Sequence, residues 1–382
     1  MNILEEIQSC SVEWKELGEV CSVKKGKQLN KNLLIEDGLY PAYNGGQTYS
    51  GRTNDYNVEA NTIIVSQGGA SAGFVNFVDT KFWANAHCYY ILPDETRVNN
   101  RFVYHFVKMN QKYLMDFQHG AGIPALKADK LTKLLLPIPP QEIQEKIVQI
   151  LDKFTDYVTE LTSELTSRKK QYSFYRDKLL SFEDEVYQVE WKKLNECLKK
   201  GKGTKITASQ MKLLHKDGAP IRIFAGGKTY ADVNYGDIPD KDIHTEEAIV
   251  VKSRGIIDFE YCTEPFSFKN EFWSYSSDNE NINLRYIYHY LVHNKEHFQN
   301  IANNMQMPQI SSNDTEKFKI PVPSLEIQSR IVQVLDNFDT VCHDLNIGLP
   351  KEIELRQKQY EFFREKLLTF VAEGEYTESR VE

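Results

Sequence analysis

The chain has 382 residues, of which 41% are hydrophobic and 26% are charged. This is enough apolar material for two or more cores and excludes a short hormone or a disordered tail. The formal net charge of -8, taken alone, argues against non-specific affinity for nucleic acid, which depends on Lys and Arg neutralising phosphates. The sequence has no Cys-x-x-Cys pair, no basic apolar leader and no membrane-length apolar run, so we expect a cytoplasmic protein without disulfides or membrane contact.

Short segments recur in the same order in the two halves of the chain. Each recurring segment, given with its second copy, is as follows: Val12–Lys15 and Val189–Lys192, Lys24–Lys27 and Lys199–Lys202, Gly45–Tyr49 and Gly226–Tyr230, Phe82-Trp83 and Phe272-Trp273, Pro137–Pro139 and Pro321–Pro323, Glu142–Asp152 and Glu326–Asp336, and Gln171–Leu180 and Gln359–Leu368. The interval of about 180 residues is that of a duplicated domain and is too long for a solenoid of short repeats.

The first part of each half alternates short apolar runs with glycine turns. Thr62–Val65 leads into Gln67–Gly69, and Ala248–Val251 leads into Lys252–Gly255. Such runs are typical of strands that end in turns. Each half therefore begins with a globule that contains a sheet.

A helix is predicted near the end of each globule. Aromatic residues at helical spacing occur in residues 101–113 and 285–298 and indicate one packed face in each segment. We therefore predict an α+β fold with two mixed α/β globules, residues 1–140 and 183–323, related by a pseudo-two-fold axis.

The remaining segments, residues 141–182 and 324–382, are predicted to be helical. Their apolar residues alternate steps of three and four, as in a coiled-coil seam. The seam residues are Ile147, Leu151, Phe154, Leu161, Leu165 and Tyr172 in the first segment and Ile331, Leu335, Phe338, Tyr360 and Phe363 in the second. The second seam meets Gly348-Leu349-Pro350, where a helix should stop or kink.

Two seams of the same pattern can bury each other as an antiparallel pair that acts as a spacer between the globules. At 1.5 Å per residue, the first helix would be about 63 Å long. Two separate dimerisation helices are the alternative. We favour pairing within the chain, because duplication supplies the partner helix.

No catalytic motif is complete. Gly227-Lys228-Thr229 lacks the first glycine of a phosphate loop, since residue 222 is Arg. His289, His293 and His297 share a helical face, but Tyr290 stands where a zinc protease has its glutamate, so packing is the favoured interpretation. We therefore predict a chain that binds rather than catalyses, with no metal site.

Candidate DNA-binding residues lie in two lysine clusters and on the glycine turns. Lysine suits phosphate contact, Gln can read adenine, and Lys or Arg can read guanine. The candidates are Lys24, Lys25, Lys27, Gln47, Thr48, Gln67 and Ser71 in the first half and Lys199, Lys200, Lys202, Lys228, Thr229, Lys252 and Arg254 in the second. A solvated face and ordinary turn polarity are the alternatives. The halves differ most at the turns, so they should read different sequences.

These features together resemble the specificity subunits of type I restriction-modification systems. The resemblance covers nearly the whole chain and rests on the duplicated globule, on Ile123-Pro124 and Met307-Pro308, on the proline breaks, and on helices with Leu151-Asp152 and Leu335-Asp336. Gly348–Arg356 looks like the C-terminal region of the type IC branch. Thr159–Thr162 followed by Ser163–Thr166 is similar to the central repeat of that branch.

The resemblance implies a DNA-recognition subunit. Each globule would read one half of a split double-stranded DNA site, while the helices and their seam residues set the gap and bind two methyltransferase subunits. Restriction subunits with ATP-driven translocation would join them. S-adenosylmethionine, ATP and Mg would bind to those partners and no cofactor to this chain. One departure, Glu142-Ile143-Gln144 where Glu-Gln is usually adjacent, concerns the register of the helix. A non-catalytic tether with two protein-binding globules is the alternative function.

The charge is distributed unevenly between the predicted segments. Residues 1–135 hold 14 basic and 14 acidic groups, and residues 188–319 hold 18 of each. All of the net acidity therefore lies in the helical segments and the tail. The globules carry no net repulsion toward DNA, and the chain should need its partners to hold DNA tightly.

Overall fold

The structure is a computed structural model that describes residues 3–116, 125–182, 189–304 and 307–370. It divides into two compact units, unit 1 formed by Met1–Thr162 with Glu352–Glu382 and unit 2 formed by Ser163–Lys351. The segment Ile123-Pro124 and the predicted boundary at residue 183 lie outside the described residues. Within the described ranges, no helix combines the length and the hydrophobicity needed to cross a membrane.

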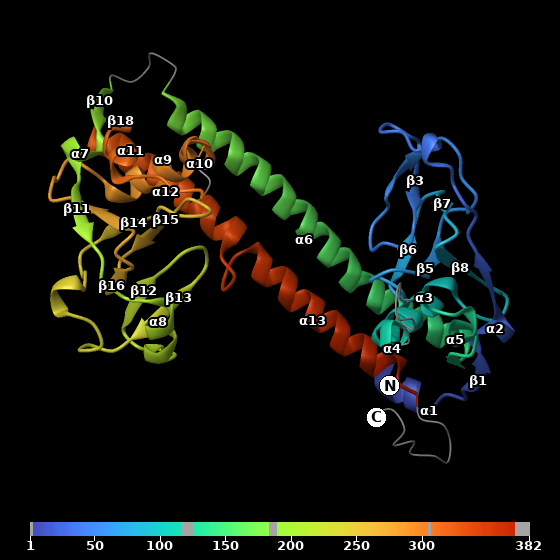
Figure 1. The fold of residues 1–382 in the computed structure, drawn as a ribbon. Helices are drawn as coiled ribbons and strands as arrows, with labels where there is room; N and C mark the ends of the chain where they lie inside the picture. The colour runs from blue at the N-terminus through green and yellow to red at the C-terminus, as the bar shows by residue number, and fades with distance from the viewer. Residues whose placement is uncertain (1–2, 117–124, 183–188, 305–306, 371–382) are drawn as a thin grey trace. The chain divides into compact units, whose positions relative to one another are not determined.

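The described residues of unit 1 form short helices and three small sheets (Figure 1). Its strands are β1 (Glu13–Glu16), β2 (Cys21–Lys25), β3 (Tyr40–Tyr43), β4 (Gly51–Thr53), β5 (Thr62–Ser66), β6 (Val75–Val78), β7 (Trp83–Ala84), β8 (Cys88–Pro93) and β9 (Leu135–Ile138). Its short helices are α1 (Ile3–Ser9), α2 (Leu17–Val20), η1 (Lys31–Leu33), α3 (Asn100–Met109), α4 (Gln111–Asp116) and α5 (Ala128–Thr132). The sheets have the strand orders β2-β8-β5-β6, β4-β3-β7 and β1-β9.

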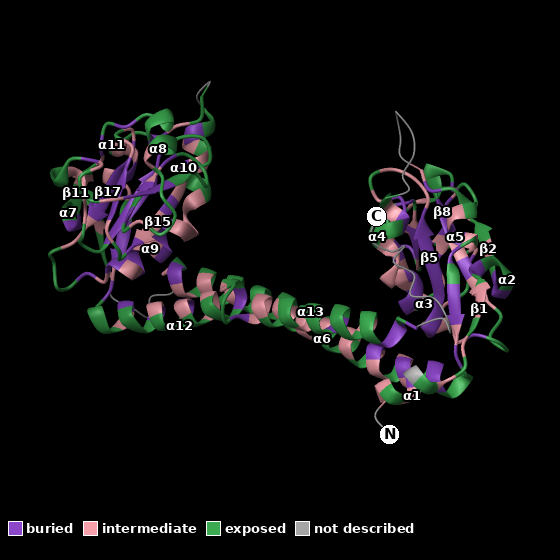
Figure 2. Cartoon of the chain, turned by 90° about the horizontal axis from the view of Figure 1, so that it is seen from below, coloured by how far each residue is buried: buried purple, intermediate pink, exposed green. Residues whose placement is uncertain are grey.

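The core of unit 1 lies between α3 and the four-stranded sheet. Strand β5 pairs with both β6 and β8, and all five of its residues are buried, as its continuous apolar run predicts. Helix α3 begins after Asn99, whose side chain accepts hydrogen bonds from the N–H groups of Arg101 and Phe102. Phe102 and Phe106 then pack in one cluster with Ile63, and Figure 2 shows the buried interior of β5 and α3.

Unit 2 repeats this plan. Its strands are β10 (Glu190–Lys193), β11 (Lys199–Lys202), β12 (Ile221–Phe224), β13 (Tyr230–Val233), β14 (Ala248–Lys252), β15 (Asp258–Cys262), β16 (Phe266–Phe268), β17 (Trp273–Ser276) and β18 (Lys319–Val322). Its short helices are α7 (Leu194–Cys197), α8 (Ala208–Leu214), η2 (Asp240–Asp242), α9 (Leu284–His293), α10 (Lys295–Asn303) and α11 (Ser312–Glu316). The strand orders β11-β17-β14-β15, β13-β12-β16 and β10-β18 match those of unit 1 one for one, which confirms the predicted duplication.

Strand pairing corrects the predicted match between the two lysine clusters. Lys25 pairs with Tyr89 on β8, and Lys202 pairs with Trp273 on β17. Tyr89 and Trp273 are equivalent, because each pairs with the second-last residue of the central strand. Lys25 is therefore equivalent to Lys202, and the matching of Lys24–Lys27 with Lys199–Lys202 is wrong by two residues.

The glycine that comes directly after each of these lysines, Gly26 or Gly203, confirms this register. A Cβ atom on Gly26 would lie 2.1 Å from the Asn85 carbonyl oxygen, and one on Gly203 would lie 2.2 Å from the Phe268 carbonyl oxygen. Both positions need glycine because another strand passes against the backbone there. The sequence matched Gly26 with Gly201 because Lys24–Lys27 and Lys199–Lys202 have the same residues in the same order.

The predicted match of Phe82-Trp83 with Phe272-Trp273 is also wrong. Trp83 lies on β7 and pairs with Ala42 of β3, whereas Trp273 lies on β17 and pairs with Val251 of β14. The two dipeptides occupy different sheets. Large apolar residues suit many buried positions. A matching dipeptide whose spacing differs from that of the other repeated segments is therefore weak evidence that two positions are equivalent.

The long helices contribute a seam to each unit. Helix α6 (Gln141–Ser181) is one continuous helix, while the second helical segment is divided into α12 (Leu325–His343) and α13 (Leu349–Leu368). The ring of Phe154 stacks on Phe363 with centroids 5.2 Å apart in unit 1. The ring of Phe338 stacks on Tyr175 at 5.8 Å in unit 2. The two seams thus repeat the same contact, as the predicted antiparallel coiled coil requires.

The break in the second helical segment lies slightly earlier than predicted. Helix α12 ends at His343, and α13 begins at Leu349 with Pro350 in its first turn. Gly348 is buried at the junction, where a Cβ atom would lie 2.4 Å from the Thr340 carbonyl oxygen. Glycine permits the close approach, and proline is tolerated at the start of the new helix.

Candidate nucleic-acid interface

Several turns of unit 1 meet at one end of its sheets. The Ser66 hydroxyl, at the end of β5, donates a 3.0 Å hydrogen bond to the Gly46 carbonyl on the β3–β4 turn. The Gln67 N–H donates to the His87 carbonyl at 2.8 Å, and the Gln67 carbonyl accepts from the Leu126 N–H at 2.7 Å. The predicted DNA-contacting residues on these turns are Gln47, Thr48, Gln67 and Ser71.

Unit 2 forms the same cluster of turns. The Lys252 ammonium, at the end of β14, donates a 3.0 Å hydrogen bond to the Gly227 carbonyl on the β12–β13 turn. The Ser253 carbonyl accepts from the Ile310 N–H at 3.0 Å, as Gln67 does from Leu126 in unit 1. The predicted DNA-contacting residues at this end are Lys228, Thr229, Lys252 and Arg254.

The candidate side chains differ in exposure. Gln47, Thr48, Lys228, Thr229 and Arg254 are exposed, whereas Gln67 and Ser71 are half-buried. Lys252 is only 3% exposed, and its ammonium lies 2.5 Å from a Glu260 carboxylate oxygen. The prediction that Lys252 itself contacts DNA is therefore at odds with its position, because its charge is already paired inside the unit. It holds the turn that carries Lys228.

The two lysine clusters lie on edge strands. β2 is the edge of its sheet and carries Lys24 and Lys25, and β11 is the equivalent edge and carries Lys199, Lys200 and Lys202. Charged residues on an edge strand also prevent unwanted pairing with another strand. The recurrence of lysine is thus explained in part by the fold.

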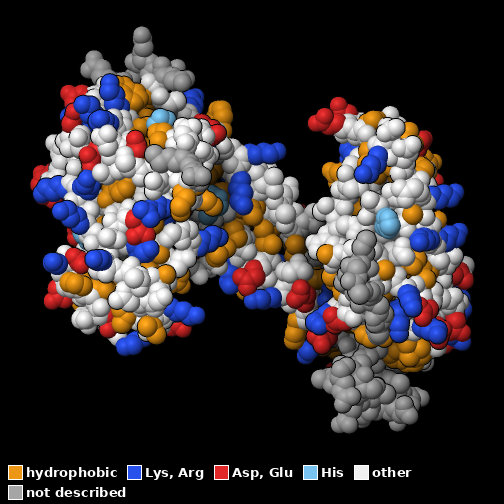
Figure 3. Space-filling model, in the orientation of Figure 1, with side chains coloured by type: hydrophobic (Ala, Val, Ile, Leu, Met, Phe, Trp, Pro, Cys, Tyr) orange, Lys and Arg blue, Asp and Glu red, His pale blue; other side chains and the backbone are white. Residues whose placement is uncertain are grey.

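Only some of these lysines lie near the turns. The C-terminal ends of β2 and β11 adjoin the turn cluster, which places Lys25 and Lys27 there in unit 1 and Lys202 in unit 2. Lys199 lies at the opposite end of β11 and pairs with Asp278, and Lys200 pairs with Glu316 at 2.5 Å. On the face drawn in Figure 3, Lys and Arg are interspersed with Asp and Glu.

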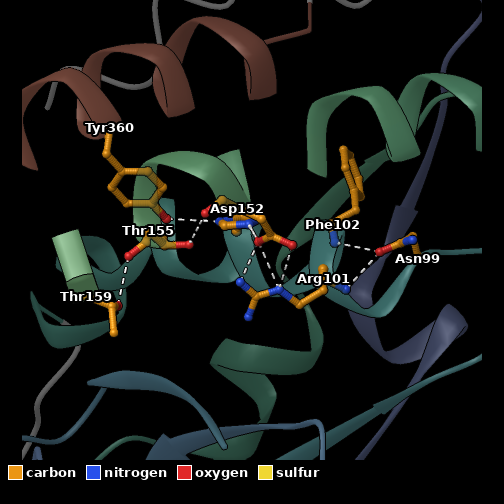
Figure 4. A network of polar contacts seen from close by, with 8 residues as sticks. Asn99, Arg101, Phe102, Asp152, Thr155, Thr159 and Tyr360 are labelled. Carbon is orange, nitrogen blue, oxygen red and sulfur yellow. Dashed lines mark hydrogen bonds and ion pairs between the residues drawn. The ribbon is translucent and has the colours of Figure 1, made fainter. Parts of the chain in front are cut away.

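A polar network ties α3 of unit 1 to the long helices (Figure 4). The Arg101 guanidinium donates to the Asp152 carboxylate at 2.5 Å and 3.0 Å. The His105 ring lies between Asp152, 2.8 Å from Nε2, and the Tyr360 hydroxyl, 3.0 Å from Nδ1. Three helices, α3, α6 and α13, therefore meet through an ion pair with two guanidinium donors and through a buried imidazole.

Burial has the largest influence on both titratable groups of this network. It lowers the pKa of His105, with the hydrogen bond to Asp152 acting in the opposite direction. It would raise the pKa of Asp152, but hydrogen bonds from His105 and Arg101 outweigh it and hold that pKa below its usual value. A neutral His105 then donates from Nε2 to Asp152 and accepts the Tyr360 hydroxyl at Nδ1. Both ring nitrogens of His105 have a hydrogen-bond partner, as in a structural contact.

Unit 2 keeps the ion pair and the imidazole. Asp336 lies 2.9 Å from Arg285 Nε and 2.8 Å from His289 Nε2. Asp339 occupies the place that Thr155 has in unit 1, and its charge adds to the effect of burial in raising the pKa of Tyr172. Unit 2 thus carries one carboxylate more than unit 1 in the same network.

Three groups of this second network could in principle hold a cation. His289, Asp336 and Asp339 offer ligand atoms within 4.8 Å of one another. Arg285 already pairs with Asp336, and unit 1 keeps the same arginine, aspartate and histidine without the third carboxylate. We interpret the group as a structural contact of the duplicated fold.

A second duplicated contact was not foreseen from the sequence. The fully buried Gln144 accepts a 2.7 Å hydrogen bond from the Asn99 N–H and donates to the Pro139 carbonyl at 2.9 Å. Gln328 repeats both bonds with Asn283 and Pro323 at 2.8 Å. The signal was present, since both glutamines recur at the interval that relates Asp152 to Asp336. It marks the join between globule and helix rather than a binding site.

Comparison with known proteins gives matches over almost the full chain. The family described as Type I restriction modification DNA specificity domain matches residues 11–168 and 188–355. An Escherichia coli protein, named Type I restriction enzyme EcoR124I/EcoR124II specificity subunit, is 31% identical over 97% of this chain and 97% of its own length. A putative type I restriction enzyme specificity subunit of Haemophilus influenzae is 30% identical over 95% of this chain and 97% of its own length.

A solved structure has the same fold. The crystal structure of a type I restriction-modification system S subunit from M. genitalium superposes with a TM-score of 0.71. It is 22% identical and covers 95% of this chain and 98% of its own chain. Each family match spans one copy of the internal repeat.

Proposed function

The chain belongs to the family of type I restriction-modification DNA specificity subunits, and we propose that each unit reads one half of a bipartite site in double-stranded DNA. One observation carries this proposal: the units share strand order and turn arrangement but differ at the exposed turn tips. Gln47 stands in unit 1 where Lys228 stands in unit 2. Gln suits adenine and Lys suits guanine in the major groove, so the half-sites should differ in sequence.

We propose that α6 sets the gap between the two half-sites. It is a single helix of 41 residues and contributes residues to both units. Two DNA-binding domains that approach the same side of a duplex need half-sites about one helical turn, or 34 Å, apart. A continuous helix suits this task because it resists bending better than a loop.

Most of the predicted seam residues are too buried for the partner-binding role that the sequence assigns to them. Ile147, Leu151, Ile331, Leu335 and Tyr360 are buried, and Phe154, Leu161, Leu165, Tyr172 and Phe338 are half-buried, so this part of the seam serves packing. Among seam residues, Phe363 is exposed. The spacer role of the seam remains compatible with this burial, whereas a partner protein needs accessible side chains.

We propose that the exposed aromatic pairs bind two methyltransferase subunits. Phe174 is 62% exposed and packs edge-on against Tyr175, while Phe362 is 53% exposed and packs edge-on against Phe363. The two pairs are equivalent positions of the repeat, one in each unit. Equivalent surfaces suit two copies of one partner, and aromatic residues are frequent anchors of interfaces.

The chemistry of the system is proposed to reside in those partners. S-adenosylmethionine would bind to the methyltransferase subunits, which methylate adenine at N6, and ATP and Mg would bind to restriction subunits that translocate DNA. The family supports this division, because its specificity subunits are non-catalytic. We place the assembled complex in the cytoplasm.

Mapping of methylated adenines tests the proposal. The chain is produced with its methyltransferase partner in a host that lacks other adenine methylation. We expect one methylated motif with two specified parts separated by unspecified base pairs. Gln47→Ala should change the first part alone and Lys228→Ala the second alone. Methylation without a bipartite motif, or methylation independent of this chain, would contradict the proposal.

Gel shifts separate DNA recognition from the tethering alternative. With the methyltransferase present, binding should prefer the mapped motif and should weaken as salt is raised. Without it, binding should be weak, because the two units carry no excess of basic residues. A tether would show no sequence preference under either condition.

A further inference from the structure

The glycine turn of unit 1 is held by two side chains of the neighbouring four-stranded sheet. Ser66 Oγ donates to the Gly46 carbonyl at 3.0 Å, and Asn76 Nδ2 donates to the Gln47 carbonyl at 2.7 Å. Ser66 ends β5, and Asn76 lies on β6 beside it. These two residues, which we call the clamp of unit 1, join a turn of one sheet to strands of another.

Unit 2 has a clamp at the same two positions. Glu260 pairs with Val250 across β14 and β15, as Asn76 pairs with Ile64 across β5 and β6. Lys252 ends β14 as Ser66 ends β5, and its ammonium donates to the Gly227 carbonyl at 3.0 Å. The Glu260 carboxylate lies 2.5 Å from that ammonium.

The two clamps use different chemistry for one task. In unit 1 two neutral donors each bind one carbonyl of the turn. In unit 2 a single buried ammonium binds the turn, and Glu260 compensates its charge, which could not remain unpaired at 3% exposure. The residue that ends the central strand thus differs in chemistry between the units but binds the equivalent backbone carbonyl in both. The target is the carbonyl group at the base of the tip residue in each unit.

Holding this carbonyl has a consequence for recognition. Gly46 precedes Gln47, and Gly227 precedes Lys228, so each clamp fixes the backbone from which an exposed tip side chain extends. A reading side chain must stay within about 0.5 Å of its productive geometry, which requires support from its neighbours. A turn built on two glycines does not supply that support by itself.

We propose that Ser66 with Asn76, and Lys252 with Glu260, are positioning residues that determine how strictly their own unit reads its half-site. The proposal rests on the proposed function and assigns specificity to residues that do not touch DNA. Each clamp acts on one half-site, because each lies inside one unit.

Unit 2 offers a matched pair of variants. Lys252→Met combined with Glu260→Gln removes the donor to Gly227 and leaves no unpaired charge, whereas Lys252→Arg keeps a cationic donor. Methylated adenines are mapped for the complex that carries each variant. The double variant should lower discrimination at the second half-site about tenfold, the size of one lost base contact, and leave the first half-site unchanged. Lys252→Arg should retain the preference at both.

Unit 1 provides an independent test with less drastic substitutions. Ser66→Ala combined with Asn76→Ala removes two neutral hydrogen bonds and should relax the first half-site alone. Ser66→Thr keeps the hydroxyl and serves as the control. Because these changes lie in unit 1, the result does not depend on whether the unit 2 variant remains folded.

The outcomes distinguish the clamp from the proposed function. A wild-type complex that methylates no bipartite motif overturns the proposed function and the clamp with it. A bipartite motif whose halves stay equally strict in both clamp variants overturns the clamp alone. Uniform loss of methylation in the unit 1 variant, with no relaxed half-site, also overturns it, since a merely structural residue would behave in this way.

Discussion

Units 1 and 2 share one architecture and differ at the surface that we assign to DNA. Both have the same three strand orders, the same buried glutamine at the join to the helix, and the same arginine, aspartate and histidine. They differ at the turn tips, in the clamp beneath them, and in α8, which unit 2 has where unit 1 has the 3-10 helix η1. Duplication has preserved the contacts that join globule and helix, while the contacts under the turns have diverged in chemistry.

The largest expected effect comes from altering the helix that the units share. Deleting Ser163 to Thr166 removes four residues and about 6 Å of α6. The original sites should no longer be methylated, and new sites should have the same two halves with a gap shorter by about one or two base pairs. Methylome sequencing measures both. Changed half-sites, or an unchanged gap, would refute the idea that α6 sets the spacing.

The next effect tests the extra carboxylate of unit 2. Asp152→Ala leaves Arg101 and the buried His105 without their partner and should destabilise unit 1 by about 2–3 kcal/mol, less than for a fully buried pair. Asp336→Ala should cost about 1 kcal/mol, because Asp339 lies close enough to replace it. Hydrogen exchange of α3 and α9 reports each unit separately.

A transplanted carboxylate provides the control for this difference. Thr155 in unit 1 is equivalent to Asp339, so Thr155→Asp in the Asp152→Ala background should recover part of the lost protection in α3. Equal losses for Asp152→Ala and Asp336→Ala, or no recovery by Thr155→Asp, would show that the third carboxylate has no compensating role.

The exposed aromatic pairs should behave alike in the two units. Phe174→Ala and Phe362→Ala should each weaken binding of one methyltransferase subunit by about 2 kcal/mol, and the double variant should weaken both sites. Analytical ultracentrifugation measures the number of subunits bound. Leu213→Ala on α8, another exposed apolar residue, is the control. If the double variant still bound both methyltransferase subunits, these aromatic pairs would not be part of the interface.

The smallest effect is a dependence of stability on pH, common to both units. Burial lowers the pKa of His105 and of His289, so the folded units favour the neutral rings. Their contribution is complete above the unfolded pKa of about 6.5 and is lost as the pH falls below it. The lowered pKa of Asp152 adds a further loss at lower pH.

Thermal melting between pH 7.5 and 5 checks this dependence. The melting temperature should fall as the pH decreases, and His105→Gln with His289→Gln should flatten the curve near pH 6.5. A curve of unchanged slope in the double variant would mean that other groups cause the loss.

Several predictions from sequence hold because they depend on pattern alone. The duplication, the strands that end in glycine turns and the paired helical seams follow from repeats and periodicity. These patterns are visible in the sequence without knowing how the strands pair. The break near Gly348 was also foreseen, since glycine and proline act locally. The DNA-contacting residues remain a prediction.

The errors concern residues whose role is set by distant neighbours. Lys252 looks like an exposed reading residue, but Glu260 and Gly227 bind its ammonium inside unit 2. The lysine clusters look equivalent letter by letter, but strand pairing shifts them by two residues. In each case the deciding contact joins segments that a linear pattern does not connect.

The order of residues along the chain is enough to predict two copies of one globule, a helical seam after each copy, neutral globules and acidic helices. Periodicity, turn residues and charge are local quantities, so they can be read from the chain in order. Which side chains are accessible to a partner depends instead on the three-dimensional contacts. Burial and pairing depend on contacts between strands of different sheets, and these turned Lys252 into a support and left Phe174 and Phe362 exposed.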